Sequence, residues 1–262
     1  MGELRTDLVT VLRAWRRQPS LPLLVVSSRV LYGLALLAVT RAPVPLLSRL
    51  LVLVAIPFLL LSAGLSGAER EWYRTVFDGG RFGLRDLVAA IYRYAGRFVA
   101  LGLLFGVPLL AFDWWLLQVA VSAQPFRPGS VAGAVRTARL LGTVPLVIVD
   151  FLLTFVSPAL VFSTRHVIDA ILDGILMIRR LWPKTLPYVL FPPLALQAIG
   201  LTSTSAFGPL SWIEVVVTSL LLLWAVGATS LFYLRHAPEV LEARGGPRPV
   251  DVLASSGGPQ HE

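Results

Sequence analysis

The sequence contains no cysteine, a single lysine and few charged residues of any kind. Without cysteine the chain can form neither disulfides nor thiolate metal sites, and it has no cysteine nucleophile. Charged residues make up 15% of the 262 positions, whereas a soluble domain carries about 25%. Together with 56% hydrophobic residues and a mean hydropathy of +0.75, this composition excludes an ordinary soluble globular domain.

The charges that are present are mostly positive. There are 23 basic and 15 acidic residues, and Lys184 is the only lysine. Such an arginine bias is common in proteins from GC-rich genomes and favours a bacterial source. A basic chain raises nucleic acid as a partner, but these arginines gather beside apolar blocks, where membrane topology and anionic lipid headgroups explain them. We therefore expect membrane lipids, and no nucleic acid, as partners.

Six apolar blocks are each close to the ~20 residues that a helix needs to cross a bilayer. They are continuous runs, without an alternation of period two, and so indicate helices. Short connections with proline or glycine join the first two and the last two blocks. The sequence thus predicts an all-α integral membrane protein whose six transmembrane helices form three hairpins. The blocks are Leu21–Thr40, Leu47–Gly67, Phe98–Val121, Leu140–Phe162, Leu186–Ala206 and Ser211–Leu234.

The basic residues predict the orientation of these helices. Seventeen of them lie in the N-terminal segment, the second and fourth connections and the C-terminal tail, against five in the other connections. The positive-inside rule then places both termini in the cytoplasm. For a bacterial protein this means the cytoplasmic (inner) membrane, crossed several times.

Three of the segments predicted to be cytoplasmic are amphipathic. Apolar residues recur at spacings of 3, 4 and 7 on short basic stretches that precede a block, which is typical of helices lying in the membrane interface. The apolar faces are Leu4, Leu8, Val11, Leu12 and Trp15; Leu84, Leu87, Val88, Ile91 and Phe98; and Ile168, Ile171, Leu172, Ile175 and Ile178.

These three segments also resemble one another. Each starts with an aspartate (Asp7, Asp86 or Asp169) and carries an arginine ten or eleven positions later. We expect one domain, residues 1–235, built from three copies of an interfacial helix followed by a hairpin; the alternative is independent helices that converged on one composition. Residues 236–262 lose their apolar content and are expected to be disordered. The repeats would be residues 3–67, 84–162 and 164–234.

Ionisable residues inside the apolar blocks are the candidate functional residues, because charge in hydrocarbon is costly unless it is paired or hydrated. Arg29 and Asp150 lie at depths that differ by about 6 Å at 1.5 Å per residue, which an arginine side chain can cover. We expect them to form an intramembrane pair. It would be either a structural ion pair that holds the helices together, or part of a polar pathway or lipid-headgroup site.

Two further acidic residues rank lower as candidates. Asp113 precedes two tryptophans in the outer part of its block, where tryptophans form an interfacial belt, and we expect it to reach the outer headgroups. Glu214 lies at the outer start of the last block, where the helix dipole favours a negative charge. The alternative roles are a buried site for Asp113 and proton transfer for Glu214.

Motifs of catalysis and of metal or cofactor binding are missing. There is no Gly-Lys-Ser/Thr phosphate loop, and the Gly-Gly-Arg-Phe-Gly run at 79–83 fits a turn and no dinucleotide pattern. The histidines His166, His236 and His261 lack the spacing of a metal site. Asp169 and Asp173 lie one turn apart, as acid–base pairs can, but we expect a solvated helix face. We predict no enzyme, no metal and no cofactor.

Some runs of residues resemble a known family. Asp78-Gly-Gly-Arg-Phe-Gly-Leu-Arg-Asp-Leu87, Thr154-Phe-Val-Ser-Pro-Ala-Leu-Val-Phe162 and Arg179-Arg-Leu-Trp-Pro183 are similar to a broad group of bacterial six-span proteins of unknown function. That group is related to the membrane domain found beside glycerophosphodiester phosphodiesterases. The resemblance covers about residues 3–235 and implies six helices with cytoplasmic interfacial helices. It supplies no catalytic residues, and the sequence has no counterpart of the phosphodiesterase domain, so that activity is not expected.

Two functions remain open from the sequence. The trio of basic amphipathic helices without a catalytic constellation favours a non-enzymatic inner-membrane protein that organises lipids or a membrane complex. Internal repeats, proline-containing blocks and the Arg29–Asp150 pair favour a transport protein instead. That would be a small permease or the membrane subunit of an ATP-driven exporter, and the exporter version requires a separate ATPase as partner.

Overall fold

The computed structural model describes residues 2–40, 44–122, 148–149, 151–202 and 209–242, at some positions by the backbone alone. Every regular element in these ranges is a helix, which confirms the all-α prediction for this part of the chain. The helices are α1 (Gly2–Arg17), α2 (Ser20–Thr40), α3 (Val44–Phe77), α4 (Leu84–Ser122), a helix at Phe151–Phe162, α6 (Val167–Arg180), α7 (Trp182–Thr202) and α8 (Pro209–Glu242).

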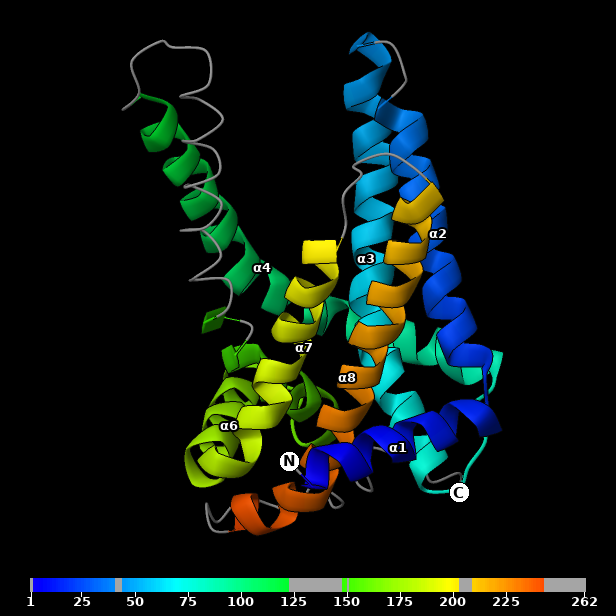
Figure 1. Ribbon diagram of the computed structural model, residues 1–262, viewed down its shortest axis with the longest axis vertical. Helices are drawn as coiled ribbons and strands as arrows, with labels where there is room; N and C mark the ends of the chain where they lie inside the picture. The colour runs from blue at the N-terminus through cyan, green and yellow to red at the C-terminus, as the bar shows by residue number, and fades with distance from the viewer. Residues whose placement is uncertain (1, 41–43, 123–147, 150, 203–208, 243–262) are drawn as a thin grey trace, which may run out of the picture.

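The long helices lie side by side, and the shorter helices α1 and α6 lie at one end of them (Figure 1). Helices α2, α3, α7 and α8 run roughly upright, α1 lies across the lower end and packs on α8, and the upper part of α4 leans away from the others. Two helices run past the predicted ends of their blocks, α3 to Phe77 and α8 to Glu242. Residues 236–242, which we expected in a disordered tail, are therefore helical, and residues 243–262 lie outside the described residues.

Two segments are long and apolar enough to cross a membrane, as judged within the described ranges. They are Leu84–Leu116 of α4 and Val215–Glu242 of α8. The first includes the stretch predicted as a separate interfacial helix, which instead forms the beginning of the 39-residue α4. Asp86 and Leu87 therefore belong to the same helix as the apolar residues near Trp114.

The connection between α3 and α4 is a compact turn whose local sequence explains its shape. Gly79 has φ +80°, and the amide of Gly80 donates to the carbonyl of Thr75 at 2.8 Å. This pattern ends α3 with a left-handed glycine and satisfies its last carbonyls. The carboxylate of Asp86 accepts from the amide of Gly83 at 2.9 Å and so caps the start of α4. The predicted turn at 79–83 is confirmed.

Helices α3 and α4 pack very closely beyond this turn. A Cβ atom on Gly64 would lie 2.7 Å from the carbonyl oxygen of Ile91, and one on Gly67 would lie 2.3 Å from the Cβ of Tyr94. Both glycines are one turn apart on the same face of α3, so the two backbones can approach without side chains between them. Small residues serve the same purpose at helix contacts in membranes.

The amphipathic helices divide their apolar faces between the protein and its surroundings. In α1, Leu4 and Val11 are buried while Leu12 is exposed; in α6, Met177 is buried while Ile168 is exposed. Each helix therefore packs on the bundle along one edge of its apolar face and presents the other edge outward. The largest fully buried side chains lie among these helices and the helices they cover: Trp72, Tyr73, Phe155, Tyr188, Phe232 and Tyr233.

Candidate functional site

The structure places the backbone of three predicted site residues. Arg29 lies within α2, Asp113 within α4 and Glu214 near the start of α8. Their side chains, and all of Asp150, lie outside the described residues. The Arg29–Asp150 pair and the roles given to Asp113 and Glu214 remain predictions.

Exposed basic side chains gather at one end of the molecule. They belong to α1, the α3–α4 turn, the start of α4, α6 with its flanking residues, and the end of α8, which lie in the lower half of Figure 1. We call this the basic end. Its exposed members are Arg5, Arg13, Arg16, Arg17, Arg81, Arg85, Arg93, Arg165, Arg179, Arg180, Lys184 and Arg235.

A buried aspartate joins three helices at the basic end. Asp7 of α1 is fully buried. Its carboxylate accepts hydrogen bonds at 2.5 Å from the hydroxyl of Tyr188 on α7 and from the guanidinium of Arg235 on α8. A charged acceptor strengthens both bonds. This site was not among the predicted ones. Asp7 lies between Leu4 and Val11 in the apolar stripe of α1, and an acid at such a position is the signal that could have identified it.

A second set of polar contacts fastens α1 to α3 and α8. The indole of Trp15 donates to the hydroxyl of Tyr73 at 2.9 Å, and this hydroxyl donates to the carbonyl of Leu223 at 2.8 Å. The indole of Trp224 donates to the carbonyl of Leu8 at 2.8 Å. Burial raises the pKa of Tyr73, an effect that the hydrogen bond from Trp15 partly offsets, so Tyr73 stays protonated and able to donate.

A buried arginine lies between α3 and α4. Arg70 donates to the carbonyl of Ser66 at 2.5 Å, and its guanidinium carbon lies 5.5 Å from the centre of the Phe98 ring. Burial lowers the pKa of Arg70 to about 10, with the charge of Glu69 acting in the opposite direction. The group is therefore cationic at neutral pH and is stabilised by an aromatic face and a carbonyl.

We predicted that Asp169 and Asp173 lie on a solvated helix face, and this prediction is wrong for Asp173. Asp169 is partly exposed, but Asp173 is only 6% exposed and turns inward on α6. The neighbouring Gly174 lies so close to Val156 that a Cβ there would be 2.7 Å from its side chain. Helix α6 therefore packs closely on the Phe151–Phe162 helix at the residue that follows Asp173.

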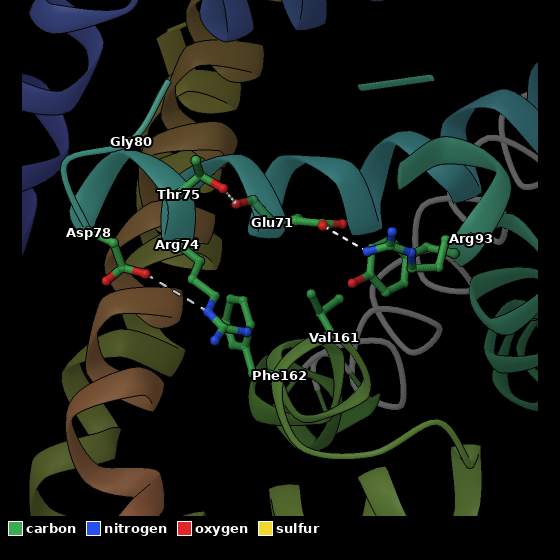
Figure 2. Close-up of a pocket in the computed structure, with 9 residues that line it drawn as sticks. Glu71, Arg74, Thr75, Asp78, Gly80, Arg93, Val161 and Phe162 are labelled. Atoms are coloured by element: carbon green, nitrogen blue, oxygen red, sulfur yellow. Dashed lines mark hydrogen bonds and ion pairs between the residues drawn. The ribbon is translucent and has the colours of Figure 1, made fainter. Parts of the chain in front are cut away.

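A cavity of about 300 Å³ opens between the end of α3, the start of α4 and the end of the Phe151–Phe162 helix (Figure 2). Four charged side chains line it. Glu71 accepts from Arg93 at 2.9 Å, and Arg74 lies 4.0 Å from Asp78. Figure 2 shows Glu71 and Arg93 reaching toward each other from different helices, above Val161 and Phe162. Guanidinium groups bind phosphates and carboxylates bind ammonium groups. The cavity can therefore bind a ligand group of either negative or positive charge.

Among the described residues, no group of three or more histidine, aspartate or glutamate side chains lies close enough together to hold a metal ion.

Comparison with known proteins gives no assignment: no family model matches this sequence, and no similar curated protein or solved structure was found.

Proposed function

We propose that the protein is an integral protein of the bacterial cytoplasmic membrane that catalyses no reaction and organises phospholipids, or a membrane complex, at its basic end. One observation carries this proposal. Leu84–Leu116 is long and apolar enough to cross a bilayer, yet only 6% of its most apolar stretch is buried. A core helix of a soluble protein would be mostly covered, and an exposed apolar surface of this extent fits hydrocarbon.

The outer part of α4 also has the side chains of an interface. Trp114 is 65% exposed and Trp115 is 53% exposed, and tryptophans at the end of an apolar helix anchor it among headgroups. At the other end of the molecule, α1 and α6 combine an outward apolar edge with arginines. That combination suits helices that lie on a membrane surface with anionic lipids.

The finer topology that we propose has six crossings, in three repeats that each begin with an interfacial helix, and both termini in the cytoplasm. Helix α1 and the end of α8 lie at the same end of the molecule in Figure 1, which supports an even number of crossings. The excess of basic residues at that end supports its cytoplasmic location. The resemblance to six-span bacterial proteins is part of this proposal.

Single cysteines would test the topology against a background with no native thiol. Ser122 at the end of α4 and His166 before α6 are both exposed. In intact spheroplasts we expect a membrane-impermeant maleimide to label Ser122→Cys at once and His166→Cys only after permeabilisation, because one crossing separates them. Labelling of both variants from the same side would contradict this topology.

The lipid-organising role predicts what co-purifies with the protein. Extracted gently into native lipid discs and analysed by mass spectrometry, the protein should retain phospholipid at about one or more molecules per chain, without a soluble subunit. The physical reason is that the basic helices and the exposed apolar edges bind headgroups and acyl chains together. A stoichiometric ATPase would contradict this role and favour the transport function, with Arg29 and Asp150 as pathway residues.

A further inference from the structure

The charged cavity at the end of α3 lies where lipid headgroups would be. Glu71 and Asp78 follow the predicted span that ends at Gly67, and Arg93 precedes the one that begins at Phe98. The cavity volume of about 300 Å³ is at the lower limit of the ~300–1,000 Å³ of small-molecule sites. Its location and size therefore suit a headgroup and not a whole lipid.

The charges of the cavity have unused binding capacity. Arg93 engages Oε1 of Glu71, and the hydroxyl of Tyr94 interacts with the same carboxylate, whose Oε2 is buried and makes no hydrogen bond of good geometry among the described residues. A buried carboxylate oxygen is costly unless a donor reaches it. The separation of 4.0 Å between Arg74 and Asp78 is too long for a hydrogen bond, so the guanidinium of Arg74 can turn to another acceptor.

We infer that the cavity binds the phosphoethanolamine headgroup of phosphatidylethanolamine. The phosphate would accept hydrogen bonds from Arg74 and Arg93, and the primary ammonium group would donate to Oε2 of Glu71. Val161 and Phe162 form the apolar side of the cavity and would contact the glycerol end of the lipid. This inference rests on the proposed function, because it requires the basic end to lie at a membrane surface.

The balance of charge selects this headgroup over its common alternatives. The four side chains that line the cavity are two arginines and two carboxylates, so a zwitterion leaves the site neutral. Phosphatidylglycerol brings a phosphate but no cation, and so adds no donor for Oε2 of Glu71. Phosphatidylcholine brings a cation, but its quaternary nitrogen has no N–H to donate.

Competition between lipids tests the inference. Wild-type protein is reconstituted in discs with equal amounts of phosphatidylethanolamine, phosphatidylglycerol and phosphatidylcholine, then released and weighed by native mass spectrometry. We expect one phosphatidylethanolamine to be retained about tenfold more often than either competitor, the ratio that corresponds to one hydrogen bond to a charged group. Glu71→Gln keeps the size of the side chain and should abolish the preference, whereas Asp86→Asn, outside the cavity, should not change it.

A second cavity variant distinguishes the loss of a lipid contact from a loss of lipid preference that is caused by misfolding. Arg74→Gln changes a side chain that is 34% exposed and should also reduce the preference, with an unchanged thermal unfolding curve. Equal retention of the three lipids by the wild type, or a preference that survives in both cavity variants, would overturn the inference. So would preferential retention of added soluble phosphoethanolamine over the lipid. Loss of all bound lipid would instead contradict the proposed function, so the two failures are distinguishable.

Discussion

Replacing Asp7 with alanine is expected to lower the free energy of unfolding by about 3 kcal/mol. The substitution removes the acceptor of two hydrogen bonds and leaves the hydroxyl of Tyr188 buried without its partner. Arg235 contributes less, because 41% of its side chain is exposed and water can solvate the guanidinium. Unfolding in mixed micelles with increasing sodium dodecyl sulfate, followed by tryptophan fluorescence, measures the effect.

The matched control is Glu3→Ala, which removes an exposed acid from the same helix and should change stability by less than about 0.5 kcal/mol. A double-mutant cycle with Tyr188→Phe isolates the hydrogen bond between the two residues. We expect a coupling free energy of about 1 kcal/mol or more. Additive effects of the two substitutions would show that Asp7 and Tyr188 do not interact.

The contact between α3 and α4 predicts a second large effect. Gly67→Ala should destabilise the protein by about 3 kcal/mol, since the new methyl group would lie 2.3 Å from the Cβ of Tyr94. That atom is next to the backbone and cannot rotate away, so the helices have to separate. The turn at 79–83 and the cavity beside Glu71 depend on the same pairing of helices.

Gly102→Ala supplies the comparison on α4. No described atom outside the helix lies within 4 Å of a Cβ built on Gly102, and alanine is the better helix former by about 1 kcal/mol. This variant should be as stable as the wild type or slightly more stable in the same unfolding assay. If Gly67→Ala and Gly102→Ala unfolded alike, the close packing of α3 on α4 would be contradicted.

Helix positions followed from local sequence to a large degree. Each long apolar block for which the structure describes most residues lies in a helix, because an uninterrupted apolar run has this one way to satisfy its backbone away from water. The turn at 79–83 was also predictable from the sequence, because glycine is the residue that most easily adopts the left-handed conformation after a helix. Helix ends were less predictable. Helix α8 continues past Leu234 to Glu242, through a mixed polar and apolar stretch in which Ala237, Val240 and Leu241 are buried, so packing and not hydropathy explains this last part of the helix.

The polar contacts of the basic end could not be predicted from the sequence in the same way. Asp7 obtains its partners from residues 181 and 228 positions away along the chain, and the sequence shows only an acid in an apolar stripe. Glu71 and Arg93 meet because two glycines let α3 and α4 approach. Asp173 is buried on α6, next to the close contact between Gly174 and Val156, and no local pattern reveals this burial.

By itself the sequence determined that the described chain is helical, where its apolar blocks lie and at which segments its arginines gather. These are local properties, set by hydropathy, spacing and backbone preference over a few turns of helix. Tertiary structure alone decided which charges are buried, which pair, and that four of them surround a cavity at the end of α3. Those outcomes depend on distances between helices far apart in the chain, which are fixed by packing at a few small residues.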